Sequence, residues 1–314
     1  MRTRTTLALA AAVSCTTLIA TVATSRDGHD GAASSPLPLP KGPYVALGDS
    51  YTAGPKIPDQ NGKPAGCDRS DRDYPALVAD GLGLEGSEFR DVSCSGATTD
   101  DLFAPQSTDH GVNPAQLSAV SAATHLITLG IGGNDIGFSS MISKCIKAGF
   151  GYQLEKWVGD KEANDTPCRD EYVSGDTDDV RAKINVVGDR VSVVLGDIKR
   201  RAPKAQVYVV GYPSILPAKG GECGQLMGLA PGDLSFLREK EQQLNTMLHD
   251  KARAAGAVYV DTYTPSVGLD VCANRDVRWI EPLIPEAPAA PVHPNERGER
   301  GMARAVLRAA GAVG

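Results

Sequence analysis

The sequence contains few aromatic residues, few histidines and no run of positively charged residues. Only 5% of its 314 residues are aromatic, five are histidine, and the net charge at pH 7 is −6. A protein that binds a phosphate backbone needs lysine and arginine clustered on one face, so we expect no nucleic-acid partner. An anionic membrane surface would likewise find no polybasic segment to attract it.

The sequence also lacks the usual metal-binding and cofactor-binding patterns. No two cysteines lie within five positions of each other and no His-Glu-x-x-His motif occurs, which disfavours zinc. The glycines at 130 and 132 look like the start of a dinucleotide-binding fingerprint, but Asp135 occupies its last glycine position. The acid expected about 20 residues later is missing as well. We therefore predict neither a metal nor a cofactor.

The first 25 residues have the pattern of a secretory signal peptide. Arg2 and Arg4 precede an uncharged apolar stretch at 7–23, which ends in small residues suited to cleavage. Two alternatives stay open: a single membrane anchor, and a lipoprotein attachment at Cys15. We expect export to the extracellular space.

The rest of the chain divides into a linker and one domain. Residues 26–42 are polar and then proline-rich, which predicts a flexible linker. Residues 43–314 show no internal repeat and no boundary, so we predict a single domain. We expect a monomer without an obligate protein partner.

Short apolar runs alternate with helical patterns along this domain. The predicted strands are 44–47, 89–94, 124–129, 205–210 and 257–260. The predicted helices are 178–201, 233–254 and 296–307; in the first of these, apolar residues recur every three or four positions. The stretch 145–175 has no strong period and is interpreted as an excursion. Such alternation predicts a parallel sheet covered by helices on both faces.

Chemically active residues follow three of these strands. Ser50 follows the first strand, Gly96 the second and Asn134 the third. Ligands of open α/β folds bind at the carboxyl edge of the sheet, where these residues would meet. Each also has a structural interpretation, because serine is a common helix N-cap and glycine a common turn residue. Their convergence favours a nucleophilic serine beside an oxyanion-binding turn.

A nucleophilic serine needs a base, and the position of each histidine selects one. Four are poorly placed: His29 in the linker, His110 in a polar loop, His125 at the opposite edge of the sheet and His249 inside a helix. His293 precedes the last helix and follows the last strand, where a loop returns to the catalytic edge. We therefore predict His293 as the base.

Four ordered blocks carry a resemblance to a known family. They are Gly-Asp-Ser-Tyr at 48–51, Ser-Gly-Ala-Thr at 95–98, Gly-Gly-Asn-Asp at 132–135 and Val-His-Pro-Asn at 292–295. The chain resembles the secreted bacterial SGNH hydrolases, also called GDSL-type esterases and lipases, over nearly all of 43–310. The resemblance implies a flavodoxin-like, three-layer α/β/α fold with a five-stranded parallel sheet. Tyr51 replaces the usual leucine, a departure that we interpret as having no mechanistic weight.

The resemblance also implies roles for individual residues. Ser50 would be the nucleophile and His293 the base. The oxyanion would be held by the backbone N–H groups of Ser50 and Gly96 and by the side-chain amide of Asn134.

One departure concerns the group that orients the base. The family usually carries an aspartate three residues before the histidine, where this chain has Ala290. Prolines recur every third residue from 282 to 294, the period of a polyproline II helix. We predict that the Ala290 carbonyl accepts from His293 Nδ1–H in place of a carboxylate. The alternative is a distant acid, Glu281 or Glu286.

Six cysteines remain once the leader is removed, which allows 15 pairings. An even number in an exported chain indicates disulfide bonds. Short excursions from the sheet favour partners adjacent in sequence, and the family resemblance implies the same scheme. The predicted pairs are Cys67–Cys94, Cys145–Cys168 and Cys223–Cys272.

These observations predict a secreted serine esterase or lipase that acts on a small-molecule or lipid ester through an acyl-enzyme. A phospholipase A and a polysaccharide O-deacetylase are alternatives within the same chemistry. A catalytically silent binding module that keeps the fold is the alternative from another class.

Overall fold

The computed structural model describes residues 42–218 and 227–312. The predicted signal peptide, all but the last residue of the predicted linker, and Cys223 lie outside the described residues. The expectations that rest on them therefore stay predictions.

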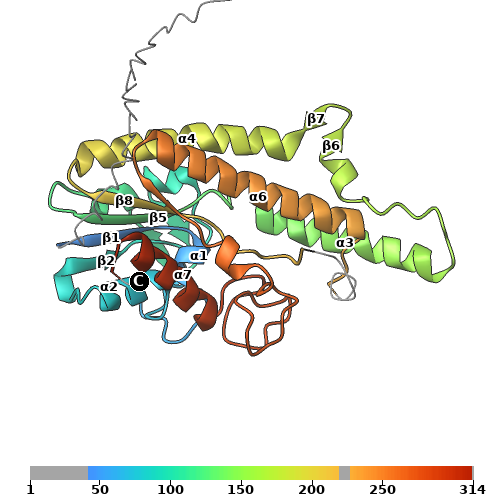
Figure 1. Cartoon of the computed structure of the whole chain (residues 1–314), viewed down its shortest axis with the longest axis horizontal. Helices are drawn as coiled ribbons and strands as arrows, with labels where there is room; N and C mark the ends of the chain where they lie inside the picture. Colours follow the sequence, from blue (N-terminus) through green and yellow to red (C-terminus); the bar gives the residue numbers. More distant parts are fainter. Residues whose placement is uncertain (1–41, 219–226, 313–314) are drawn as a thin grey trace, which may run out of the picture. The chain divides into compact units, whose positions relative to one another are not determined.

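A parallel five-stranded sheet forms the centre of the domain (Figure 1). Its strands are β1 (Tyr44–Gly48), β2 (Phe89–Asp91), β5 (Leu126–Gly130), β8 (Gln206–Val210) and β9 (Val258–Val260). They lie in the order β2-β1-β5-β8-β9, and every pairing is parallel. The parallel sheet predicted from the apolar runs is confirmed, as is the five-stranded flavodoxin-like form that the family resemblance implied.

The central strands explain why the sequence forms a sheet here. Every residue of β1 and β5 is buried, as expected for strands covered on both faces. Their register pairs Gly48 with Gly130, so both strands end at the same level. A Cβ atom on Gly48 would lie 2.6 Å from the Gly130 carbonyl oxygen, which only glycine avoids. The segments that follow the two strands therefore emerge side by side.

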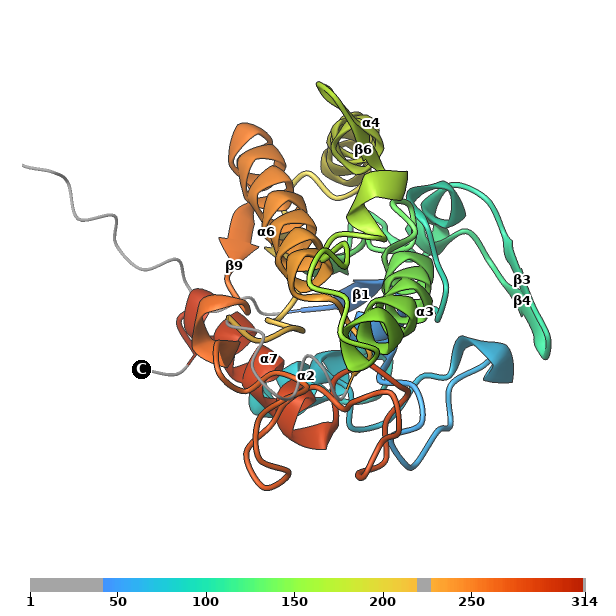
Figure 2. The ribbon, with the colours of Figure 1, turned by 90° about the vertical axis from the view of Figure 1, so that its right-hand side faces the viewer.

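Helices cover both faces of the sheet and complete three layers (Figures 1 and 2). On one face lie α2 (Tyr74–Gly81) and α7 (Glu296–Ala309), packed against each other. On the other lie α4 (Asp179–Arg201) and α6 (Pro231–Ala254), and α3 (Phe138–Trp157) packs against α6. Buried apolar residues fill both interfaces as two separate clusters. The predicted α/β/α architecture is confirmed.

Short elements connect these layers. They are α1 (Ser50–Ala53), the hairpin of β3 (Gln106–Thr108) and β4 (Gly111–Asn113), the hairpin of β6 (Val173–Ser174) and β7 (Thr177–Asp178), and several 3₁₀ turns. None of the helices in the described ranges combines the length and apolarity needed to span a bilayer.

Helix α3 corrects one sequence expectation. The stretch 145–175 is not irregular at its start, because α3 continues through it to Trp157. The buried face of α3 includes Met141, Cys145 and Gly149, spaced four residues apart. Beyond Gly149 the large apolar side chains Phe150, Leu154 and Trp157 are exposed. Because these apolar residues lie on the exposed face of the helix, the sequence does not show the helical period of its buried face.

Two predicted disulfide bonds are confirmed. Cys67 pairs with Cys94, and Cys145 pairs with Cys168. The first bond links the connection after α1 to the residues that follow β2. The second bond ties the segment that follows α3 back to that helix. Cys272 is also disulfide-bonded, while its predicted partner Cys223 lies outside the described residues.

Candidate active site

Ser50 stands where β1 turns into the short helix α1. The Asp49 side chain caps this helix by accepting the Tyr51 N–H at 2.9 Å, which fixes the start of the turn. Ser50 itself is therefore not the N-cap, the role that a serine at such a turn commonly has. Its backbone N–H has no hydrogen-bond partner within the described ranges. The side chain of Ser50 is left to face the pocket at the carboxyl edge of the sheet.

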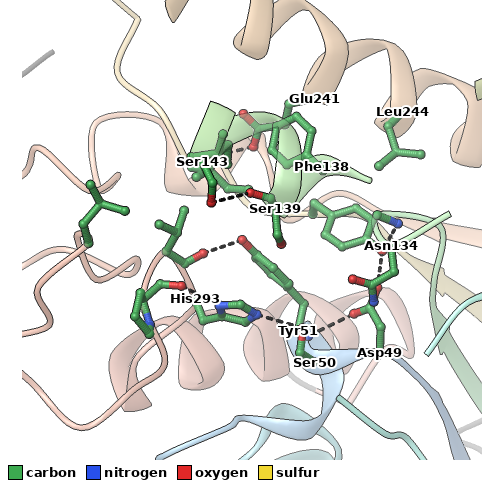
Figure 3. Close-up of a pocket in the computed structure, with 17 residues that line it drawn as sticks. Asp49, Ser50, Tyr51, Asn134, Phe138, Ser139, Ser143, Glu241, Leu244 and His293 are labelled. Atoms are coloured by element: carbon green, nitrogen blue, oxygen red, sulfur yellow. Dashed lines mark hydrogen bonds between the residues drawn. The ribbon is translucent and has the colours of Figure 1, made fainter. Parts of the chain in front are cut away.

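His293 comes from the loop before α7 and meets Ser50 across 243 positions of sequence. Its Nε2 atom lies 2.8 Å from Ser50 Oγ (Figure 3). Asn295 caps α7 two residues later, by accepting the N–H groups of Arg297 and Gly298, which anchors the loop to the helix. The predicted nucleophile and base are thus brought together as a hydrogen-bonded pair.

The residue that orients His293 is not the one predicted. His293 Nδ1 lies 2.8 Å from the carbonyl oxygen of Pro291. The Ala290 carbonyl is already used, because it accepts the backbone N–H of His293 at 3.2 Å. That bond closes a four-residue turn with proline second and Val292 third at φ +60°, the features of a type II turn. The turn leaves the carbonyl of its central peptide, that of Pro291, free to face the imidazole.

The surroundings of His293 favour its neutral form. Burial lowers the pKa of the imidazole below its usual value of 6.5, and the contact with the Pro291 carbonyl opposes this shift only in part. With Nδ1–H donating to that carbonyl, Nε2 carries the lone pair that faces Ser50 Oγ. This is the tautomer that a general base requires.

The two carboxylates considered as alternatives are occupied elsewhere. The buried carboxylate of Glu281 accepts from Arg278 and Asn295, and also from two backbone N–H groups. Glu286 accepts from Arg278 at 2.8 Å. Within the described ranges, neither carboxylate has a hydrogen bond to the imidazole of His293. Glu281 supports the loop differently, because its backbone N–H and C=O pair with His293 and Val292 at 3.0 Å each.

The candidate oxyanion donors lie on neighbouring turns. Asn134 lines the pocket with Ser50, and its side-chain amide donates one N–H to the Ala97 carbonyl at 2.9 Å. An amide nitrogen carries two hydrogens, so one remains for a ligand. Gly96 lies on the adjoining loop in a left-handed conformation, with φ +79°. Its N–H has no partner within the described ranges, although Gly96 itself does not line the pocket.

Asp49 and Tyr212 connect the serine turn to the asparagine turn. The Tyr212 hydroxyl donates to Asp49 Oδ2 at 2.5 Å and accepts the Gly133 N–H at 2.8 Å. Burial raises the pKa of the Asp49 carboxyl from 3.8 to about 7, against the lowering effect of its hydrogen bonds to Tyr212 and Tyr51. The bridge joins the turn that holds Ser50 to the turn that holds Asn134.

The pocket beside Ser50 has a volume of about 140 Å³. Its apolar lining comes mainly from Phe138, Ile142, Ile215, Leu244 and Leu283. The buried residue Glu241 lies across the pocket from Ser50 (Figure 3) and accepts the Ile215 N–H at 2.9 Å. Burial raises the pKa of Glu241 well above its usual value, which favours the uncharged form of this carboxyl. The site is suited to an uncharged, mostly apolar group of small size.

The other histidines within the described ranges stay away from this pocket. His110 lies in the turn between β3 and β4, His125 precedes β5 at the opposite edge, and His249 is exposed on α6. Those ranges contain no group of three or more His, Cys, Asp and Glu side chains that could hold a metal ion.

Sequence reasoning missed three residues of the site. Tyr212 and Glu241 carry no motif, since one follows β8 and the other lies in the middle of α6. Tyr51 was visible beside the serine, but it was interpreted as having no mechanistic weight. In the structure its hydroxyl donates to the Val292 carbonyl at 2.6 Å, beside the base.

Comparisons with known proteins agree with this geometry. The model of the GDSL-like lipase/acylhydrolase family matches residues 46–300. The chain is 37% identical to Lipase 2 of Streptomyces coelicolor over 243 residues, which cover 77% of this chain and 76% of that protein.

Solved structures extend the likeness to the fold. The phospholipase A1 of Streptomyces albidoflavus superposes with a TM-score of 0.67 at 25% identity, covering 85% of this chain and 98% of that one. The extracellular lipase of Streptomyces rimosus superposes with a TM-score of 0.65 at 26% identity, covering 86% and 100%. The resemblance inferred from four short blocks is confirmed. This chain belongs to the GDSL-like lipase/acylhydrolase family and is a serine-type carboxylic ester hydrolase.

Proposed function

We propose that this esterase acts through a Ser50–His293 dyad in which the Pro291 carbonyl takes the place of a triad acid. The observation that carries the proposal is a pair of contacts made by the imidazole of His293. Its Nε2 atom lies 2.8 Å from Ser50 Oγ, and its Nδ1 atom lies 2.8 Å from the Pro291 carbonyl oxygen. Ser50 and His293 lie in a pocket that also contains the Ser50 backbone N–H, which has no partner in the part of the chain that the structure describes.

The chemistry proceeds in two steps. Neutral His293 takes the proton of Ser50 Oγ as this oxygen attacks the ester carbonyl, and a tetrahedral oxyanion forms. The N–H groups of Ser50 and Gly96 and the free N–H of Asn134 stabilise that oxyanion. His293 then gives the proton to the departing alcohol. Water, activated by the same histidine, hydrolyses the acyl-enzyme and releases the acid.

The size of the pocket supports a preference for short acyl chains. A protein cavity of about 150 Å³ accommodates a molecule the size of benzene, and the volume here is about 140 Å³. We propose that the enclosed part of the substrate has roughly six non-hydrogen atoms, as in a butanoyl ester. A phospholipase A activity is the second candidate, favoured by the likeness to the phospholipase A1 structure.

Two experiments test these proposals. A fluorophosphonate should label wild-type protein at Ser50 and leave Ser50→Ala unlabelled; an unlabelled wild type would point to a silent binding module. A series of p-nitrophenyl esters with 2 to 16 acyl carbons, beside phosphatidylcholine vesicles, identifies the substrate class. Greatest kcat/KM on long chains would refute the short-chain preference, and release of fatty acid from the vesicles would establish the phospholipase.

The same proposal includes the location and assembly of the enzyme. Export through the leader at 1–25 is supported by the disulfide bonds and by the extracellular relative. N-terminal sequencing of protein from the culture medium would test cleavage near residue 23. A monomer in sedimentation is expected, because both members of the dyad come from one chain.

A further inference from the structure

The loop that presents His293 contains a backbone conformation that its sequence does not favour. Val292 has φ +60°, in the left-handed region. A branched side chain rarely adopts this region, and the third position of a type II turn is normally glycine or asparagine. Contacts outside the turn must therefore hold Val292 in place.

Two such contacts bind the backbone of Val292 from opposite sides. Its N–H donates to the Glu281 carbonyl at 3.0 Å. Its carbonyl accepts the Tyr51 hydroxyl at 2.6 Å, one of the shorter hydrogen bonds in the site (Figure 3). The first contact supports the central peptide of the turn, whereas the second fixes the peptide that leads directly into His293.

Tyr51 also touches the imidazole itself. The two ring centroids lie 4.9 Å apart at an angle of 35°, so the phenol limits the rotation of the histidine ring. On its other side the phenol packs edge-on against Tyr212 at 5.2 Å. Burial, with the nearby Glu241 and Asp49 carboxyls, raises the pKa of Tyr51 well above its usual value. The hydroxyl therefore remains a donor throughout the working pH range.

Tyr51 is the residue immediately after Ser50, in α1. One side chain thus extends from the helix that holds the nucleophile to the loop that holds the base. We infer that Tyr51 is a positioning residue that fixes His293 between Ser50 Oγ and the Pro291 carbonyl, by holding the Val292 carbonyl and packing on the imidazole. The inference rests on the proposed dyad.

The simpler interpretation is that Tyr51 only lines the pocket and contacts substrate. Tyr51→Phe separates the two, because it keeps the ring and removes only the hydroxyl. If the hydroxyl positions His293, kcat should fall about 10–100-fold, the usual cost of a small misplacement, with KM within about twofold. The rate of fluorophosphonate labelling should fall by a similar factor, since this reagent reports the reactivity of Ser50 rather than recognition of the natural ester.

A second measurement does not depend on turnover. Histidine ¹⁵N NMR of the wild type should show His293 as the Nδ1–H tautomer, and Tyr51→Phe should show a mixture of both tautomers. Tyr172→Phe is the matched control, since Tyr172 stacks on Phe236 away from the dyad. It should leave kcat, labelling and the tautomer unchanged.

Three results would overturn the inference: Tyr51→Phe keeps more than about half of the wild-type kcat, changes KM alone, or leaves the tautomer as it is. If the Phe variant folds poorly, the tautomer and labelling rate of Tyr51→Leu, whose side chain has no hydrogen-bond donor, serve the same test. Failure of the dyad itself would look different, because Ser50→Ala would then keep its activity whatever residue occupies position 51.

Discussion

Two variants, Glu281→Gln and Glu286→Gln, distinguish a carboxylate that stabilises the folded loop from one that takes part in catalysis. Glu281 is fully buried, and its carboxylate accepts five hydrogen bonds from Arg278, Asn295 and the N–H groups of Glu286 and Ala287. A glutamine side chain has only one acceptor oxygen. Its NH₂ group is itself a donor and would be placed against the donors that the second carboxylate oxygen now accepts. Arg278, only 5% exposed, would lose a charged partner. Removing one member of a buried ion pair costs about 3–5 kcal/mol of unfolding free energy.

Glu286 is the matched control because it binds the same arginine from the surface. Its side chain is 52% exposed, so Glu286→Gln should cost less than about 1 kcal/mol. Urea unfolding measures both values. In the folded fraction, counted by fluorophosphonate titration, kcat should change less than about tenfold in either variant, whereas loss of a true triad acid costs nearer ~10⁴-fold.

Two outcomes would refute this reasoning. Equal stability of the two variants would mean that the buried carboxylate does not support the loop. A thousand-fold loss of kcat in either variant at unchanged folded fraction would mean that a carboxylate, and not the Pro291 carbonyl, orients His293.

Four further predictions concern the site and its scaffold. Asn134→Ala should lower kcat by about 100–1,000-fold, measured on a p-nitrophenyl ester, because it removes one oxyanion donor; an unchanged rate would remove Asn134 from the site. The pH profile of kcat/KM should rise with a midpoint below 6.5, since burial lowers the pKa of His293 and the neutral form is active; a midpoint above 7 would contradict this. The pKa of Asp49 is raised from 3.8 to about 7 in the folded state, so its contribution to stability is present at low pH and lost as pH rises to 7. Relative to Asp49→Asn, the wild type should therefore lose about 4 kcal/mol of unfolding free energy between pH 4 and pH 8, and a flat difference would exclude the shift. Replacing both Cys145 and Cys168 by serine should cost about 2–4 kcal/mol in urea unfolding with little effect on kcat, because the bond holds an excursion and not the dyad.

The sequence was sufficient to predict the sheet and the pairing of Ser50 with His293 in space. Continuous apolar runs mark the strands, and glycine ends the first of them at Gly48. His293 follows from where the other histidines lie. These inferences depend on local patterns and on topology, both of which sequence spacing reflects well.

The acceptor for His293 Nδ1 was predicted one residue too early, for a physical reason. Proline periodicity suggested extended backbone at Ala290, but the chain turns there. The turn needs a positive φ at Val292, which valine does not signal. The contacts that hold it come from Tyr51, 241 positions earlier, and from Glu281, which lies outside the turn. Local propensity cannot predict a conformation that tertiary contacts impose.

The distance between Ser50 and His293 along the chain has a consequence for biosynthesis. The proposed nucleophile lies in the first block of the domain and the proposed base in the last, 243 positions later. A nascent or truncated chain that ends before residue 293 has the serine without its base. It also lacks α7, the helix that covers α2 and follows the catalytic loop. With the proposed dyad, ester hydrolysis begins only when nearly the whole domain has been made and folded, and the growing chain is inactive without a separate inhibitor.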